Sequence, residues 1–451
     1  SAQIALRRIS LLEGRGRWDD AFALAREACR RYPRFFWLWR QRFLLELRAG
    51  LPEAAEACLR DPPASNRDEE SVVYLTRAEF AEARWNLAGA IELLRCAQER
   101  APQSLWVCHE FFKAAYVAFD MEEVDRQRHI MEPLWAEEAA RQGVSPHISQ
   151  TFFGYLYDEL TLARDALAAL LRVGRREPAE RIGPLLAQVR AQPDYTPAAM
   201  ALMVAMRQAG AFADPPPGKG TGAEPSPIPH RITQYWNKPF PPADLSELME
   251  TWRHNNPDFA CKLFDDAAGQ AFVEERYGAK VLRAYQRIRE PAQRADVFRL
   301  AWLYAEGGYY IDTDDCCLAP LRRFIPPHAG LVMYQEEWGS LGNNFIGAAP
   351  LHPVIGRALH LVIEAIERDD HDSVWLASGP GLLTRAFAQA LAGSDLEWHT
   401  WLRHVKVFDR LEFYRFDAPH RFAAYKVRGH WSRMPRLRDR PGARKEAPAA
   451  R

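Results

Sequence analysis

Two aspartates separated by one residue, Asp312 and Asp314, are the first candidates for chemistry in this sequence. They follow the apolar residues 309–311, which predict a short strand, and open α/β sheets bind their ligands at the carboxyl ends of such strands. Two carboxylates there can hold a hard divalent cation, with water or phosphate oxygens in the remaining coordination positions. Such a cation would neutralise the charge that develops on a diphosphate leaving group. The D-x-D pattern alone carries little weight, because it occurs by chance in many surface turns.

A second pair of charged residues precedes this motif, within a largely helical segment predicted over 281–305. Asp296 and Arg299 are three residues apart, so they share one helix face and could meet one ligand there. Gly307 and Gly308 then predict the end of the helix and a tight turn with positive φ. The alternative is that Asp296 and Arg299 form an ordinary surface ion pair.

The chain after residue 228 alternates short apolar segments with longer amphipathic ones, which indicates an α/β sheet domain. The predicted strands cover 231–236, 259–264, 309–312 and 330–334, and the predicted helices cover 245–253, 281–305, 353–368 and 381–391. The D-x-D motif is therefore expected at the end of the third of these strands.

The first part of the chain, residues 1–211, has apolar residues at three- and four-residue spacing and predicts helices throughout. The helices predicted at 18–32 and 87–100 align so that Ala21 falls on Ala90. That spacing of about 70 residues is close to twice the period of tetratricopeptide repeats. This part resembles a degenerate tetratricopeptide-like domain, and an irregular helical bundle is the alternative. In either case, we expect this part to provide a surface of stacked helices and no group of catalytic residues.

Proline and glycine concentrate in residues 212–227, where they favour a linker because neither residue supports a helix or a central strand. The predicted organisation is a helical domain over 1–211, this linker, an α/β domain over 228–435, and a disordered tail over 436–451. The tail prediction rests on its richness in Arg, Pro and Ala.

The overall composition limits the possible partners. Lys plus Arg and Asp plus Glu each number 59, so no net charge attracts nucleic acid or an anionic membrane. The seven cysteines lack the C-x-x-C spacing of a zinc site and are expected to be reduced thiols. No secretion signal is visible at the first residues, and no apolar run approaches the ~18 residues of a membrane span. We expect a cytoplasmic protein without a transmembrane segment.

Further motifs surround the D-x-D pair in a fixed order. Asp296 and Arg299, then Leu-Tyr, Gly-Gly, a tyrosine and D-x-D resemble the donor-binding core of glycosyltransferase family 32, which contains yeast-type initiating mannosyltransferases. The large clostridial glucosylating toxins share a similar core. The resemblance covers residues 228–432. It also includes the segments 228–236, 252, 256–259, 263–266, 343–345, 352–353 and 378–381.

The resemblance implies a GT-A-type nucleotide-sugar-binding fold and a role for each matching residue. It implies base stacking by Trp236, donor contacts by Asp296, Arg299, Tyr310 and Asn344, contacts to ribose and metal-bound water by Asp312, metal ligation by Asp314, and closure by His430 on the metal and Trp431 over the donor. Asp312, Asp314 and Arg299 would be the catalytic residues. Trp236 could instead be a core aromatic, and His430 a solvated histidine, because the spacing of residues 425–432 departs from the family pattern.

The sequence thus predicts a retaining, Mn²⁺- or Mg²⁺-dependent hexosyltransferase that uses a UDP- or GDP-sugar and a glycan or protein acceptor. Retention is implied by the resemblance, and a front-face mechanism would need no protein nucleophile. Asp265, Asp266 and Asp315 are additional carboxylates, of which Asp315 is expected to support the metal. The helical domain would position the acceptor or a partner. The alternatives are a helical-repeat scaffold with a catalytically silent transferase domain, and a metal-dependent phosphohydrolase.

Overall fold

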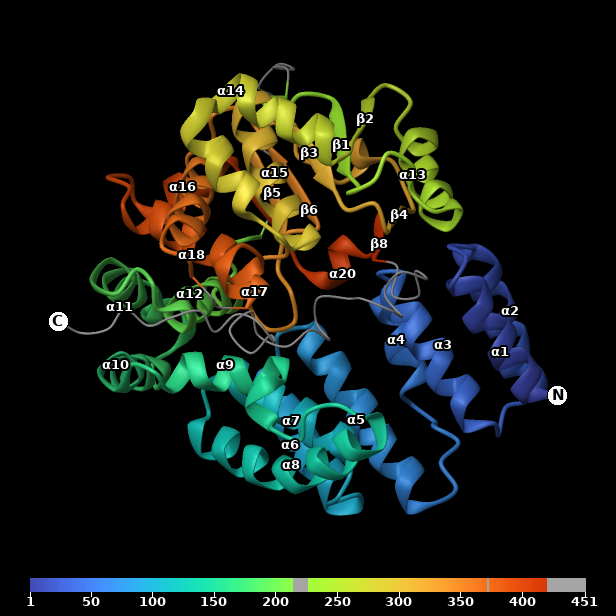
Figure 1. The fold of residues 1–451 in the computed structure, drawn as a ribbon. Helices are drawn as coiled ribbons and strands as arrows, with labels where there is room; N and C mark the ends of the chain where they lie inside the picture. Colours follow the sequence, from blue (N-terminus) through green and yellow to red (C-terminus); the bar gives the residue numbers. More distant parts are fainter. Residues whose placement is uncertain (214–225, 371–372, 420–451) are drawn as a thin grey trace.

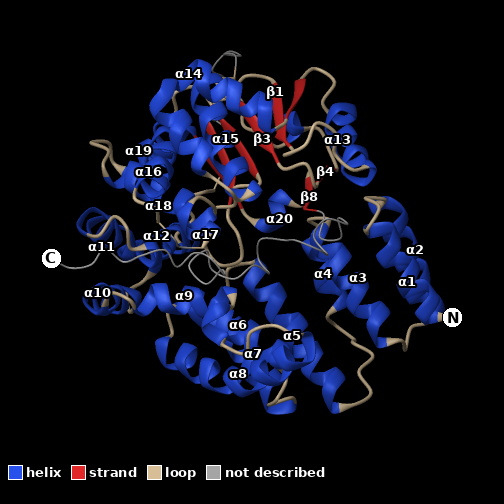
Figure 2. Ribbon diagram, in the orientation of Figure 1, coloured by secondary structure: helices blue, strands red, loops and turns tan. Residues whose placement is uncertain are grey.

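The computed structural model describes residues 1–213, 226–370 and 373–419. Helices form the first part of the chain, and a mixed sheet with helices packed around it forms the second (Figure 1; Figure 2). This arrangement confirms the predicted order of a helical region followed by an α/β region. The predicted tail over 436–451 and residues 214–225 of the predicted linker lie outside the described residues.

The helical region buries the same positions in its two aligned helices. Its helices are α1 (Ala2–Glu13), α2 (Trp18–Arg31), α3 (Phe36–Arg48), α4 (Pro52–Cys58), α5 (Arg67–Ala83), α6 (Leu87–Arg100), α7 (Leu105–Ala118), α8 (Met121–Gln142), α9 (Phe152–Thr161), α10 (Arg164–Gly174), α11 (Pro178–Ala191) and α12 (Thr196–Gln208). Ala21 of α2 and Ala90 of α6 are both fully buried. Each helix ends two residues before a proline, Pro33 or Pro102, because the residue preceding proline disfavours the helical conformation. Neighbours in the chain pack as pairs, including α1 with α2, α5 with α6, and α11 with α12.

The α/β region is built on a six-stranded sheet with the strand order β2-β1-β3-β6-β5-β7. Its strands are β1 (Arg231–Tyr235), β2 (Ala260–Phe264), β3 (Gly308–Ile311), β5 (Leu331–Tyr334), β6 (Phe345–Ala348) and β7 (Val405–Phe408). β1 is parallel to both β2 and β3, whereas β6 is antiparallel to β3 and β5. A second, two-stranded sheet pairs β4 (Asp315–Cys317) with β8 (Asp417–Pro419) in the antiparallel sense. β1, β2, β3 and β5 were predicted, but β4, β6, β7 and β8 were not.

Helices surround the sheet and fix its strand ends. They are α13 (Ala243–Asn255), α14 (Asp266–Arg287), α15 (Pro291–Glu306), α16 (Pro353–Glu367), α17 (Val374–Ala377), α18 (Pro380–Ala392), α19 (Trp398–Trp401) and α20 (Arg410–Phe413). The predicted helical segment 281–305 is divided between α14 and α15, because Pro291 keeps Glu290 in an extended conformation and starts a new helix. Gly307 has a φ of 66°, and a Cβ there would meet Pro350 at 2.6 Å. The predicted glycine turn is therefore confirmed.

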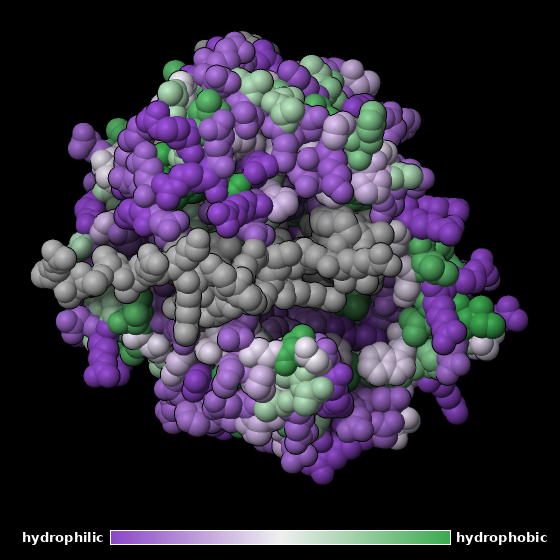
Figure 3. All heavy atoms as spheres, viewed as in Figure 1, coloured by the Kyte–Doolittle hydropathy of each residue, from purple (hydrophilic) through white to green (hydrophobic). Residues whose placement is uncertain are grey.

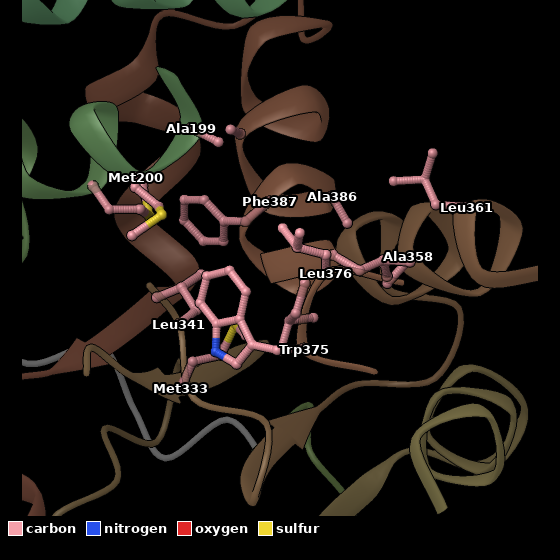
Figure 4. Close-up of a cluster of buried hydrophobic side chains, with 14 of the residues drawn as sticks. Ala199, Met200, Met333, Leu341, Ala358, Leu361, Trp375, Leu376, Ala386 and Phe387 are labelled. Carbon is pink, nitrogen blue, oxygen red and sulfur yellow. The ribbon is translucent and has the colours of Figure 1, made fainter. Parts of the chain in front are cut away.

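The two regions share one hydrophobic core. Every residue from Thr196 to Met206 of α12 is buried, and α12 packs against α18 of the α/β region. Figure 4 shows Ala199 and Met200 of α12 beside Phe387 of α18, with Trp375 on the other side of the same cluster. This contact removes a fully apolar helix surface from water, which is the main source of stability for such a helix.

The other end of the helical region also contacts the α/β region. Trp18 of α2 belongs to the same buried cluster as Leu248 of α13 and Cys316 of β4. In Figure 1, α1 to α4 accordingly lie beside α13, β4 and β8, whereas α11 and α12 lie beside α18. The seven cysteines are free thiols. Among the described residues, no helix combines the length and apolar character needed to cross a bilayer.

A core truncation tests the shared packing. Phe387 is fully buried, so Phe387→Ala should lower the free energy of unfolding by about 3–5 kcal/mol, through lost burial and the cavity left behind. The matched control is Phe240→Ala, because Phe240 is 87% exposed and its loss should have little effect. Urea unfolding followed by circular dichroism measures both. Equal stability of the two variants would contradict the packing described.

The lowered pKa of one histidine, His352, makes the stability of the fold depend on pH. His352 caps α16 by accepting a hydrogen bond from the backbone N–H of Val354 at 3.3 Å, and burial lowers the pKa of His352 from 6.5 to about 4. The unfolded chain therefore takes up a proton at higher pH than the folded chain, and stability falls as the pH drops from 6.5 towards 4.

His352→Asn should remove this component, on the order of 2 kcal/mol, because asparagine also caps helices but does not titrate. Thermal unfolding at a series of pH values measures the effect. Parallel pH profiles for the wild type and His352→Asn would show that His352 has no such role.

Candidate functional site

The D-x-D motif lies at the carboxyl end of β3, at the edge where β1 also ends. Asp312 and Asp314 follow Ile311, the last residue of β3. Because β1 and β3 are parallel, Trp236, which follows β1, and Asp312 lie at the same edge of the sheet. The Gln234 side chain of β1 donates a hydrogen bond to the backbone oxygen of Asp312 at 3.4 Å. The sequence-based placement of the motif at a strand end is confirmed by this geometry.

Arg299 connects the helix before β3 with the motif after it. Its Nη2 lies 3.2 Å from Oδ1 of Asp296 and 3.2 Å from Oδ1 of Asp312. The side chains of Arg299 and Asp296 are only 5% and 6% exposed, so the alternative of a surface ion pair is wrong. Burial by itself would lower the pKa of Arg299, but Asp312, Tyr310 and Asp296 raise it above its usual value. The guanidinium therefore stays charged between two carboxylates.

Asp296 is satisfied by three different elements. Besides Arg299, it accepts hydrogen bonds from Nδ2 of Asn343 at 2.9 Å and from Oγ of Ser378 at 2.7 Å. Arg299 also donates to the backbone oxygen of Asn343. Burial raises the pKa of Asp296, and Arg299, Ser378 and Asn343 offset part of that rise. The loop before β6 and the turn after α17 are thereby tied to α15.

Tyr310 lies beneath the arginine. Its ring centroid is 4.4 Å from the guanidinium carbon of Arg299, a distance at which the cation and the ring attract each other. Tyr310 is fully buried, and burial raises the pKa of its hydroxyl well above 10. Tyr310 is therefore a neutral support for Arg299, next to the proposed donor contacts.

Asn344 holds the residue that follows the motif. Its Nδ2 donates to Oδ2 of Asp315 at 2.7 Å, and its Oδ1 accepts from the hydroxyl of Tyr334 at 2.7 Å. The backbone N–H of Asp312 donates to the backbone oxygen of Asn344 at 2.8 Å. The side chain predicted to contact the donor therefore braces Asp315 in this structure, and the expected supporting position of Asp315 next to the motif is consistent with that contact.

Sequence reasoning missed a further carboxylate in this region, Asp417. It is fully buried, and among the described residues neither of its carboxylate oxygens has a hydrogen-bond partner. Burial raises the pKa of Asp417 well above 3.8, and the charges of Asp315, Asp314 and Asp312 raise it further. An isolated aspartate after an aromatic-rich segment gives no recognisable sequence signal, because only the pairing of β8 with β4 brings it to the motif.

The remaining predicted residues differ in how far the structure describes them. Trp236 is half-buried, and its backbone N–H donates to the backbone oxygen of Phe264 at 2.9 Å. It packs against the cluster that contains Trp18 and Leu248. His430 and Trp431 lie outside the described residues. Within the described part of the chain, no three His, Cys, Asp or Glu side chains are grouped closely enough to bind a metal ion on their own.

Comparison with known proteins identifies the region around this site. Residues 242–331 match the family described as the glycosyltransferase sugar-binding region containing the DXD motif. The initiation-specific alpha-1,6-mannosyltransferase of Schizosaccharomyces pombe is 32% identical over 195 residues, which cover 36% of this chain and 49% of that protein. The mannosyl phosphorylinositol ceramide synthase SUR1 of Saccharomyces cerevisiae is 29% identical over 139 residues, which cover 30% of this chain and 35% of that protein.

A solved structure, the PaToxG glycosyltransferase, aligns over 52% of this chain and 82% of its own, with a TM-score of 0.33 and 18% identity. That score is below the level that identifies a fold. The sequence matches confirm the predicted resemblance, and residues 242–331 correspond to the glycosyltransferase sugar-binding region that contains the DXD motif. For this matched region, the comparisons support the predicted class of glycosyltransferase. The chain spans about half the length of the first two curated relatives it matches.

Removal of the Arg299 charge tests its structural role. Arg299→Met should lower the free energy of unfolding by about 3–5 kcal/mol, because it leaves the buried carboxylate of Asp296 and the partly buried carboxylate of Asp312 without their cation. Arg299→Lys should give a smaller loss, since lysine retains the charge but not the planar fork that reaches several acceptors. Chemical unfolding measures both variants.

The control for this experiment is Arg253→Met. Arg253 pairs with Glu250 at 3.0 Å, but the two side chains are 46% and 65% exposed, and such surface pairs contribute about 1 kcal/mol or less. If Arg299→Met were no less stable than Arg253→Met, the buried network would not hold the site together.

Proposed function

We propose that this protein transfers a hexose from a UDP- or GDP-sugar to a glycan or protein acceptor, in a reaction that depends on Mn²⁺ or Mg²⁺ and retains the anomeric configuration. The observation that carries the proposal is the Asp296–Arg299–Asp312 network, in which the guanidinium and Asp296 are buried, at the sheet edge where the D-x-D motif lies. The curated relatives named above are a mannosyltransferase and a mannosyl phosphorylinositol ceramide synthase, which supports a hexose as the transferred group.

The architecture supports a nucleotide-sugar site of the GT-A type at this edge. Donors bind outside the carboxyl ends of parallel strands, where loops can approach a ligand without interrupting the sheet. β1 and β3 are adjacent parallel strands, and they carry Trp236 and Asp312 at those ends. Trp236 would then stack on the nucleotide base while Asp312 meets the ribose.

The different exposures of Asp296, Arg299 and Asp312 suggest a different role for each in donor binding. The side chain of Asp312 is 31% exposed, whereas that of Arg299 is only 5% exposed. A ligand at the sheet edge would therefore meet Asp312 first. Arg299 would hold that carboxylate in place and lend positive charge to the phosphate side of the donor, with Asp296 and Tyr310 fixing the guanidinium.

The residues present fit a hard divalent cation. All the candidate ligands in the described region are carboxylate oxygens, which suit Mn²⁺ and Mg²⁺, and the buried Asp417 beside them has no hydrogen-bond partner among the described residues. Asp312 and Asp314 would hold the ion, with His430 as a further candidate outside the described residues. When bound, the ion would neutralise charge that develops on the leaving diphosphate.

The three additional carboxylates noted in the sequence, Asp265, Asp266 and Asp315, are already engaged, which supports a reaction without a protein nucleophile. Asp265 caps α14 by accepting the N–H of Ala268 at 2.8 Å. Asp266 pairs with Arg294 at 2.5 Å, and Asp315 is held by Asn344. A front-face reaction, in which the leaving phosphate accepts the proton of the acceptor hydroxyl, requires none of them.

The helical region would position the acceptor or a partner. Lys113 of α7 lies 3.3 Å from Glu337, which belongs to the loop between β5 and β6 and also pairs with Arg410 at 2.8 Å. That loop continues to Asn343 and Asn344, so α7 contacts the segment that shapes the site. Around the residues drawn in grey, the face seen in Figure 3 is mostly hydrophilic.

Two features of the whole chain belong to the same proposal. The stacked helix pairs support a tetratricopeptide-like form of the helical region, separated from the α/β domain at about residues 212–227. The seven free cysteines support a reducing, cytoplasmic location.

Nucleotide release tests the proposed activity. The full chain with MnCl₂ is incubated in turn with UDP-glucose, UDP-N-acetylglucosamine, UDP-galactose and GDP-mannose, and free UDP or GDP is measured. We expect release from one of these donors. Asp312→Asn and Asp314→Asn should each lower the rate by about 100-fold or more, because the transition-state charge is no longer neutralised.

The matched control is Asp395→Asn, since Asp395 is exposed and distant in sequence from the motif; its rate should equal the wild-type rate. Absence of release with every donor would favour a catalytically silent scaffold. Release that persists in Asp314→Asn would refute the metal-dependent chemistry, and cleavage of simple phosphate esters would favour a phosphohydrolase.

A further inference from the structure

The two-stranded β4–β8 sheet brings a second pair of acidic residues, Asp315 and Asp417, together next to the D-x-D motif. In the β4–β8 pairing Asp417 lies directly opposite Cys317, so their side chains are on the same face of the sheet. Asp315 is two residues before Cys317 and shares that face, because successive side chains of a strand alternate. Asp315 and Asp417 are therefore diagonal neighbours, although they are about 100 residues apart in the chain.

These two carboxylates differ in what surrounds them. Asp315 receives the amide of Asn344 at 2.7 Å. Asp417 is 0% exposed, and among the described residues both of its oxygens lack a hydrogen-bond donor. Its neighbours in sequence, Phe413 and Phe416, are fully buried in an aromatic cluster. A buried carboxylate in such surroundings normally pairs with a cation or coordinates a metal, because desolvation without compensation is costly.

Within the described part of the chain, Arg299, the arginine that contacts the D-x-D motif, does not pair with Asp417. Arg299 lies 3.2 Å from both Asp296 and Asp312, donates hydrogen bonds to backbone oxygens and packs over the ring of Tyr310. For its carboxylate to be ionised, Asp417 therefore needs a different source of positive charge, and the adjacent carboxylates of Asp315 and Asp314 increase that need.

We propose that Asp417 is a further ligand of the divalent cation held by the D-x-D motif. This inference rests on the proposed function and adds to it a residue from β8. The described carboxylates are not pre-assembled as a three-ligand group, so a side chain must turn towards the ion when it binds. Asn344 restrains Asp315, whereas no hydrogen bond among the described residues restrains the carboxylate of Asp417. Asp417 is the side chain that can turn.

Manganese binding by the metal-depleted full chain tests this role directly. MnCl₂ alone is titrated into the wild type and Asp417→Asn, and free Mn²⁺ is followed by electron paramagnetic resonance. Asp417→Asn should bind Mn²⁺ about 10- to 100-fold more weakly. Without metal its melting temperature should equal or exceed that of the wild type, because the neutral amide avoids the desolvation cost that burial places on a carboxylate. The rise in melting temperature on adding MnCl₂ should be largely lost.

Two companion variants keep the test informative. Asp409→Asn removes a carboxylate from the same segment but preserves the cap of α20, whose N–H of Glu412 is bound at 2.8 Å; its Mn²⁺ affinity should match the wild type. Asp417→Glu retains a carboxylate and should retain most of the binding, which covers the case in which Asp417→Asn does not fold.

The outcomes separate this inference from the proposed function. Wild-type Mn²⁺ affinity in Asp417→Asn, with binding lost in Asp314→Asn, would overturn the role of Asp417 and leave the proposed function standing. Wild-type protein that binds no Mn²⁺, even with UDP or GDP present, would overturn both. A lower metal-free melting temperature with unchanged Mn²⁺ binding would make Asp417 a purely structural residue.

Discussion

The site depends on one buried guanidinium. Arg299 lies between a carboxylate of its own helix, Asp296, and a carboxylate beyond the next strand, Asp312. This bridge fixes the end of β3 relative to α15, and Asn343 and Ser378 attach two further loops to the same carboxylate, Asp296. Because these groups are desolvated together, loss of one member leaves the others uncompensated. Donor binding at the sheet edge can therefore use a preformed arrangement of charges.

The helical region is part of the same structure. α12 completes the core around α18. Trp18 belongs to the same buried cluster as Cys316, which lies two residues after the D-x-D motif. Lys113 contacts the loop that leads to the asparagines of the site through Glu337, and Glu337 also holds Arg410 of α20, just before β8. These contacts connect the helical region with the loops that surround the D-x-D motif. Such contacts give a physical reason for the two regions to occur in one chain.

Local patterns in the sequence predicted the local features. The three-residue spacing of Asp296 and Arg299 on a helix, the glycine turn and the strand that precedes Asp312 all follow from short-range rules, and the structure agrees with them. Asp417 could not be predicted in this way, and Ser378 was indicated only through the resemblance, because long-range pairing and packing bring both residues to the site. The short strands β4 and β8 have too few residues to show a period, and α12 gave no sign in the sequence that its partner was α18. The roles proposed for His430 and Trp431 stay predictions.

The most direct test of a D-x-D cation site is to locate the ion. Crystals grown with MnCl₂ and UDP or GDP, measured at a wavelength where manganese scatters anomalously, reveal the position of Mn²⁺ without assumptions about the reaction. We predict an anomalous peak in contact with the carboxylate of Asp314 and the nucleotide diphosphate, close to Asp312. A nucleotide bound at this sheet edge without such a peak, or a peak far from both aspartates, would contradict the proposed chemistry.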